Sequence, residues 1–181
     1  GAADARAAEA ARLRDALATG QIRAWFQPIV GLADDAVRGY EALVRWEHDD
    51  GTIGAPDTFI PTAERTNLIV DLDRVVLRDA LDLLARLPAS QHVSVNVSAA
   101  SLSAPELVAV VEQALETASV DPSRLHLEIT ETSLVHVTDK VQAAMRTLAA
   151  RGVRWYVDDF GTGYSSLTHL RDLPIAGLKL D

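Results

Sequence analysis

Five polar side chains occur in runs of sequence that are otherwise apolar and typical of strands. They are Glu41, Asn96, Glu128, Asp158 and Lys179, and each lies in the second half of its run or ends it. Buried carboxylates need neutralisation, and one lysine cannot neutralise three of them. Three carboxylates and an amide oxygen, in a chain without cysteine, suit a hard cation such as Mg²⁺ or Mn²⁺. The residue types therefore predict a metal site built from oxygen ligands.

These side chains would be carried by six runs that are β-branched or alternating and that end at Gly, Pro, Ser or Asp. Helical patterns separate most of the runs, which indicates a parallel sheet covered by helices. The loop between the first two runs is too short for a crossover helix, so these two strands are predicted to be antiparallel. The predicted strands are 22–30, 38–46, 92–98, 124–131, 153–159 and 176–181, and the predicted helices are 4–18, 71–87, 103–117 and 138–151, with a short helix after Tyr164.

Local signals predict where helices and turns begin and end. Ser103 and Glu106 fit a capping box at the start of one helix, and Gly152 fits the residue that ends another. The glycines of the GTG segment after Asp159 predict a turn with positive φ, which is a simpler interpretation than a phosphate-binding loop.

The period of two along a strand predicts the direction of the polar side chains. Asn96 lies opposite a face of three valines, and Glu128 lies opposite a face of leucine and isoleucine. If the apolar faces contact the helices, each strand sends one oxygen-bearing side chain into the interior of the sheet. The same alternation sends Asp158 inward and Asp159 to the other face. The sequence distance between these strands matches a barrel in which ~250 residues make eight repeats.

Composition narrows the classes of partner. The chain of 181 residues has 26 acidic and 17 basic residues, a net charge of −9, which disfavours polymeric nucleic acid as a partner. No apolar run approaches the roughly 18 residues of a membrane helix. The absence of cysteine suits a reducing cytoplasm, and we expect a cytoplasmic protein.

From Ile22 onward the chain resembles the EAL domain family, which is named after the tripeptide that begins at Glu41. Seven sequence blocks carry the resemblance in the order typical of the family. It implies an α/β fold, a modified TIM (β/α)8 barrel whose first strand is antiparallel. It also implies phosphodiesterase activity that opens the bacterial second messenger cyclic di-GMP to linear pGpG. The blocks are FQPIV, YEALVRW, PDTFIPTAER, VSVNVSA, LEITE, DDFGTGYSSL and LKLD.

The resemblance also implies a two-metal site for Mg²⁺ or Mn²⁺. Glu41, Asn96, Glu128 and Asp158 match the metal ligands of the family. Asp159 matches the residue that binds a second metal and helps to position the attacking water. Two metals about 3.5–4 Å apart can hold the attacking and leaving oxygens of a displacement at phosphorus.

Other positions match residues that contact substrate or shape the site. Lys179 matches the lysine that contacts the attacking water and the phosphate. Gln27, Leu43 and Arg45 match substrate contacts, with Arg45 on a phosphate oxygen. Glu131 matches the glutamate that holds the DDFGTG loop in place.

Two features depart from the family pattern. Tyr156 stands between Trp155 and Val157, where a small residue is usual, and would narrow the interior if it points inward. The chain reaches Asp181, the aspartate of the family's lysine strand, after about six strands, whereas family members continue through two more. At the other end, we expect residues 1–20 to be an N-terminal linker or entry helix. Residues 21–181 would form an EAL domain that lacks the C-terminal part of its barrel, and the chain as given would have impaired activity.

The parent protein is expected to be a bacterial signalling enzyme. The resemblance implies a homodimer and an upstream sensor or diguanylate cyclase domain. Two alternatives remain open: a catalytically inactive receptor or scaffold of the same fold that binds cyclic di-GMP, and an interaction domain that uses its acidic surface and binds no nucleotide.

Overall fold

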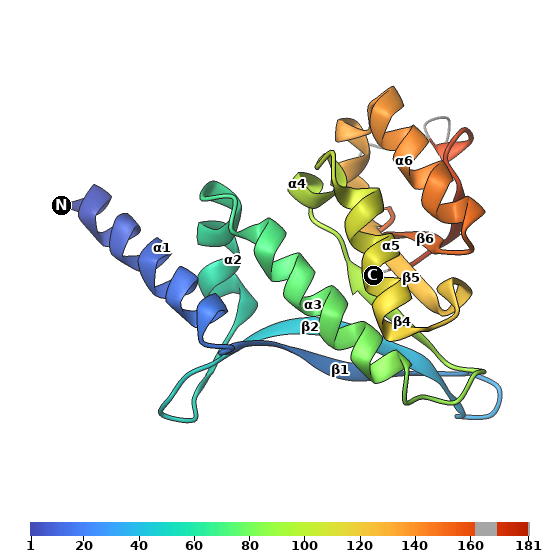
Figure 1. Cartoon of the computed structure of the whole chain (residues 1–181), viewed down its shortest axis with the longest axis horizontal. Coiled ribbons are helices and arrows are strands. Elements are labelled where there is room, and N and C mark those ends of the chain that lie inside the picture. The colour runs from blue at the N-terminus through green and yellow to red at the C-terminus, as the bar shows by residue number, and fades with distance from the viewer. Residues whose placement is uncertain (162–169, 181) are drawn as a thin grey trace.

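The computed structural model describes residues 1–161 and 170–180, except the side chains of residues 2 and 3. Helices and strands alternate along most of the chain (Figure 1). The helices are α1 (Ala2–Ala18), α2 (Pro56–Arg65), α3 (Ile69–Leu84), α4 (Ala99–Leu102), α5 (Leu107–Ala118) and α6 (Asp139–Ala150), with 3₁₀ helices η1 (Pro122–Arg124) and η2 (Glu131–His136). The strands are β1 (Ile22–Val30), β2 (Val37–Glu47), β3 (Ile53–Gly54), β4 (His92–Asn96), β5 (Leu125–Thr130), β6 (Arg154–Asp158) and β7 (Ile175–Leu178).

The sheet has the topology expected of a TIM-like barrel with a modified first strand. Its strand order is β1-β2-β4-β5-β6-β7, and the two-residue β3 pairs with β2. β1 and β2 are antiparallel, as the short loop between them predicts, whereas β2, β4, β5, β6 and β7 pair in parallel. All six predicted strands are present, and β3 makes a seventh within the described residues. The carboxyl ends of the parallel strands therefore meet at one edge, where the candidate site lies.

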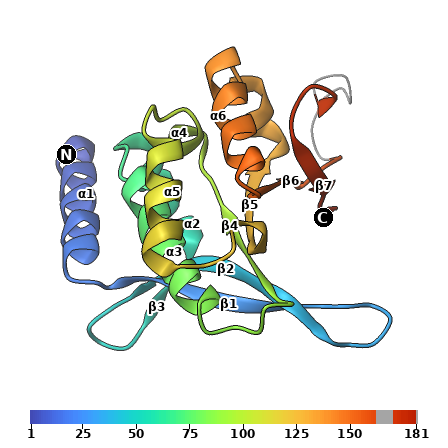
Figure 2. The same cartoon turned by 45° about the vertical axis from the view of Figure 1, so that its right-hand side comes forward.

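The outer face of the sheet packs against α3, α5 and α6 (Figure 2). The apolar residues of β4, β5 and β6 that alternate with the polar ones point into this layer. Val93, Leu125, Trp155 and Val157 are fully buried there. The predicted assignment of faces is thus confirmed, because the helices cover the valine and leucine side and leave the polar side facing inward.

A second core joins α1 to the barrel. Ala10, Leu13 and Ala16 follow one face of α1 and are buried. Leu13 and Ala16 belong to a cluster with Trp46 of β2 and Phe59 of α2, and the Arg12 guanidinium lies 5.8 Å from the centroid of the Trp46 ring. The helix expected to be a linker or entry helix therefore packs against the domain along this face. Among the described residues, no helix is both long and apolar enough to span a membrane.

One predicted helix start is wrong. Ser103 and Glu106 form no capping box, because residues 99–102 make an additional short helix, α4, for which Ser103 is the C-cap. The chain therefore enters α5 from a helical turn, and Glu106 pairs with Arg74 at 3.0 Å instead. The end of α6 is as predicted, with Gly152 at φ 108°. The helix predicted after Tyr164 falls on residues outside the described part.

The inner face carries a row of rings beneath the candidate site. His92 stacks on His126 with ring centroids 4.0 Å apart, and His126 stacks on Tyr156 at 4.8 Å. Burial, and then the nearby charges of His92 and Arg154, lower the pKa of His126 to about 3, so its ring is neutral at physiological pH. Tyr156 has room because Gly177 of β7 faces it: a Cβ on Gly177 would lie 2.6 Å from the tyrosine ring. The bulky residue at position 156 is thus matched by a missing side chain on the next strand.

We predict that Gly177→Ala lowers the free energy of unfolding by about 1–3 kcal/mol, because the added methyl group overlaps the Tyr156 ring. The same substitution in a Tyr156→Ala background should cost close to nothing. Urea unfolding of the four proteins in this double-mutant cycle measures the coupling. Equal costs in both backgrounds would show that the ring does not set the requirement for glycine.

Candidate active site

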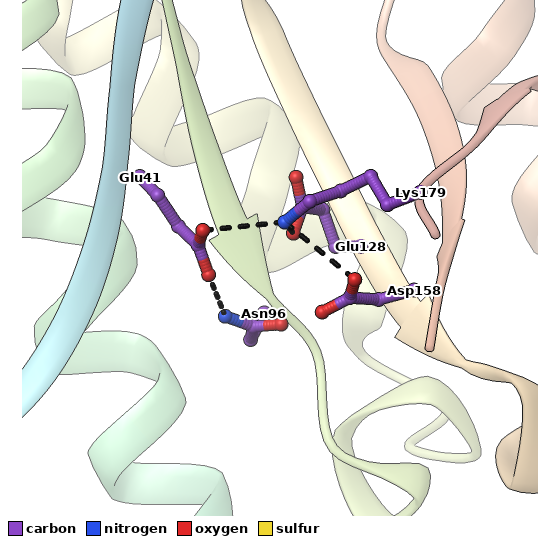
Figure 3. A network of polar contacts seen from close by, with 5 residues as sticks. All are labelled: Glu41, Asn96, Glu128, Asp158 and Lys179. Atoms are coloured by element: carbon purple, nitrogen blue, oxygen red, sulfur yellow. Dashed lines mark hydrogen bonds and ion pairs between the residues drawn. The ribbon is translucent and has the colours of Figure 1, made fainter. Parts of the chain in front are cut away.

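Four strands bring their inward polar side chains together at the carboxyl edge of the sheet. Asn96 pairs in register with Glu128, and the register of β2 with β4 places Glu41 beside Ser94. Asp158 ends β6, next to β5. The five residues predicted to do chemistry from within apolar strands face one another in one cluster (Figure 3).

Lys179 lies at the centre of this cluster. Its Nζ is 2.6 Å from an oxygen of Glu128, 3.2 Å from one of Glu41 and 3.7 Å from one of Asp158. The backbone of Lys179 is held by β6, since its N–H donates to the carbonyl of Val157 at 2.8 Å. Its side chain therefore reaches across the inner face from just beyond the end of β7.

Burial and the Lys179 charge act in opposite directions on the most buried carboxylate of the cluster. Glu128 is 2% exposed, and burial raises its pKa, although Lys179 and the Ser94 hydroxyl favour its charged form. Burial by itself would lower the pKa of Lys179, but the hydrogen bond to Glu128 and the nearby carboxylates outweigh it and raise the pKa. The lysine is therefore charged, and one positive charge faces three carboxyl groups.

These donors fit a hard divalent cation. Oxygen atoms of Glu41, Glu128 and Asp158 lie within 4.8 Å of one another. Carboxylates from three strands, without histidine or cysteine, are typical of Mg²⁺ or Mn²⁺ rather than Zn²⁺. Asn96 is adjacent, but its Nδ2 donates to Glu41 at 3.2 Å, so its amide would have to rotate to offer the oxygen. Three of the five predicted ligands thus meet directly.

The fifth predicted ligand, Asp159, differs in geometry. It is exposed and lies outside the three-carboxylate group, with a left-handed φ of 55°. This backbone turn directs it away from the line of β6. Gly161 also has a positive φ, of 101°, as predicted for the first glycine of GTG, and its N–H donates to the buried Glu131 carboxylate at 2.9 Å. The contact ties the segment after β6 to η2.

A cavity of about 540 Å³ opens beside the acidic cluster. Leu43 and Arg45 of β2 line it together with Asn96 and Glu128. Gln27 on β1 is exposed and pairs in register with Glu41. The structure places the three predicted substrate contacts on the inner face around the cluster, and their contact with a ligand stays a prediction. Asp181 lies outside the described residues.

The sequence interpretation missed Asp73 of α3, which lines the same cavity. Its carboxylate accepts hydrogen bonds from the Ser98 N–H at 3.0 Å and the Ser101 hydroxyl at 2.6 Å. It thereby fixes the turn that follows Asn96. Burial raises the pKa of Asp73, against the effect of these hydrogen bonds. A sequence signal for its inward position was available, because Asp73 lies four residues after Ile69 and four before Leu77, both of which are buried.

Comparisons with known proteins define the class. The sequence model of the EAL domain matches residues 10–181, and the chain belongs to the EAL domain family. The chain is 43% identical over 173 residues to "Cyclic di-GMP phosphodiesterase NbdA" of Pseudomonas aeruginosa. It is 40% identical over 174 residues to "Bifunctional diguanylate cyclase/cyclic di-GMP phosphodiesterase MucR" of the same organism. Each match covers 93% of this chain, but only 22% and 25% of the respective relative.

A solved structure of a relative has the same fold as this chain. "PaMucR Phosphodiesterase, c-di-GMP complex" superposes with a TM-score of 0.87 at 39% identity. The match covers 93% of this chain and 70% of that one. The modified TIM-barrel fold expected from the resemblance is therefore confirmed.

We predict that Lys179→Met destabilises the protein by about 2 kcal/mol in metal-free buffer, because it leaves Glu128 buried without its partner. This is less than the ~3–5 kcal/mol of a fully buried pair, since the Lys179 side chain is 31% exposed. Adding Mg²⁺ should recover stability, because a cation that binds only the folded state stabilises it. Lys140→Met on the exposed surface of α6 is the matched control for urea unfolding. Equal losses in both variants would contradict the prediction.

Proposed function

We propose that this domain hydrolyses cyclic di-GMP to linear pGpG with the help of Mg²⁺ or Mn²⁺. The observation that carries the proposal is the group of Glu41, Glu128 and Asp158 around Lys179, beside a cavity of about 540 Å³. The relatives named as cyclic di-GMP phosphodiesterases support the choice of substrate. A cyclic dinucleotide is also compatible with a net charge of −9, because cations and Arg45 can offset its two phosphates locally.

Each residue has a proposed task. Glu41, Glu128 and Asp158, with Asn96 after rotation of its amide, would hold the cation. A bound cation would polarise the phosphoryl group and lower the pKa of a water molecule. Lys179 would place its ammonium group against the charge that develops on the phosphoryl oxygens.

The proposed substrate contacts would come from the first two strands. Arg45 would pair with a phosphate oxygen, for which the guanidinium fork is well shaped. Leu43, on the same face of β2, would form an apolar wall, and Gln27 would contact the substrate from β1. Alternation along β2 supports this proposal, because Glu41, Leu43 and Arg45 occupy successive positions on one face.

Asp159 is proposed to serve a second metal and to help position the attacking water. Its left-handed backbone takes it off the strand, and the hydrogen bond from Gly161 to Glu131 would keep the segment in place. Glu131 is thus proposed to anchor the loop.

For the whole protein, we propose a cytoplasmic, homodimeric signalling enzyme with a sensor or diguanylate cyclase domain before this one. The chain spans about a quarter of the length of the curated relatives described above, and one of them is named as bifunctional. The position of α1 ahead of β1 would let it connect such a domain to the barrel.

We predict that Glu41→Gln lowers kcat at least about 10²-fold, the size of effect seen when one group that stabilises the transition state is removed. The assay is conversion of cyclic di-GMP to pGpG in the whole protein that carries this domain. Glu116→Gln, an exposed change on α5, is the matched control. Removal of divalent cations with a chelator should abolish turnover in the wild type.

Calorimetric measurement of cyclic di-GMP binding distinguishes an enzyme from a receptor and from an interaction domain. Binding of cyclic di-GMP by the wild type without turnover would favour a receptor over an enzyme. The absence of binding would favour an interaction domain. Full activity of Glu41→Gln would remove Glu41 from the mechanism.

A further inference from the structure

Trp25 is the one exposed tryptophan of this chain. Its exposed fraction is 46%, whereas Trp46 and Trp155 are 7% and 0% exposed and belong to the two cores. The ring therefore offers water an apolar area of the kind that cores and interfaces bury.

The position of Trp25 on β1 is specific. Because β1 is antiparallel to β2, its first residues lie at the same edge as the carboxyl ends of the parallel strands. Trp25 pairs in register with Leu43, and its neighbours two residues away, Arg23 and Gln27, pair with Arg45 and Glu41. Directly opposed residues share a face, so Trp25 is on the inner face.

The indole is also held in a defined orientation. Its Nε1 donates to an Oε1 of Glu47, at the end of β2, at 2.7 Å. Glu47 lies four residues beyond the in-register partner Leu43, so the ring extends toward the edge where the candidate site opens. The hydrogen bond satisfies the polar atom of the indole and leaves the ring faces for an apolar or aromatic group.

We propose that the indole of Trp25 is a stacking platform for one guanine base of the substrate. This inference rests on the proposed function, because it takes cyclic di-GMP as the ligand. A base that contacts the wall at Leu43 lies within reach of the ring, since directly opposed residues have Cβ atoms about 4.5–5.5 Å apart. Arg45, one inner-face position further along β2, would meanwhile hold the phosphate. Aromatic stacking accepts any base, so Trp25 contributes affinity for the nucleotide, and polar contacts elsewhere select guanine.

The test is cyclic di-GMP binding by the full chain, with Ca²⁺ in place of Mg²⁺ to slow turnover. Calorimetry on Trp25→Ala should show affinity about 5- to 150-fold weaker than the wild type, the usual range for loss of one base stack. Trp25→Phe should bind more tightly than Trp25→Ala, because phenylalanine still presents a ring. Trp46→Phe, a change on the outer face, is the matched control and should bind as the wild type does.

Tryptophan fluorescence gives a second readout that does not depend on the alanine variant folding. Base stacking should quench the emission of the wild type and of Trp46→Phe. Trp25→Phe should show no quenching at ligand concentrations where calorimetry still detects binding.

The possible results distinguish a failure of the stacking role from a failure of the proposed function. Wild-type binding with unchanged affinity in Trp25→Ala, or with quenching that persists in Trp25→Phe, overturns the stacking role alone. Absence of any binding by the wild type overturns the proposed function, and the stacking role with it.

Discussion

The candidate site depends on one constraint, which is that three carboxyl groups are held close together on the inner face of one sheet. Glu41, Glu128 and Asp158 have oxygens within 4.8 Å of one another, and Glu128 is almost completely buried. Like charges at this distance in a site of low dielectric need compensation. Lys179 supplies one positive charge from 51 residues beyond Glu128, at the far end of the described sheet. The strand order thus brings together acidic groups that would separate in water, and the excess of carboxylates over lysine is a setting in which a cation could bind.

The layer below the carboxylates explains how the sheet accommodates them. The stacked rings of His92, His126 and Tyr156 fill the inner face below the carboxylates, and the low pKa of His126 means that its ring adds no positive charge there. A large ring at position 156 is possible only because β7 offers Gly177 opposite it. A large ring at position 156 therefore limits which residue β7 can carry at position 177.

Sequence patterns were sufficient for whatever follows from alternation and spacing. The period of two predicted that Asn96, Glu128 and Asp158 point inward, and the short loop predicted the antiparallel pair of β1 and β2. Effects that depend on three-dimensional neighbours were not accessible. The capping box at Ser103 was wrong because an extra helical turn precedes it, and Asp73 was missed because its partners, Ser98 and Ser101, lie on another element. The position of the Lys179 ammonium between three acids depends on the register of β6 with β7, which the local sequence does not encode.

The adjacent aspartates at the end of β6 show how one backbone angle separates two neighbouring carboxylates. Asp158 keeps the strand conformation and joins the carboxylate cluster with Lys179 at 3.7 Å. Asp159 adopts φ 55°, an uncommon conformation for a residue with a Cβ, though aspartate tolerates it better than most. Such a conformation persists when the surrounding structure favours it. Here the N–H of Gly161, two residues after Asp159, donates a hydrogen bond to the buried Glu131 carboxylate. Because the chain turns between them, Asp158 belongs to the three-carboxylate group and Asp159 lies outside it.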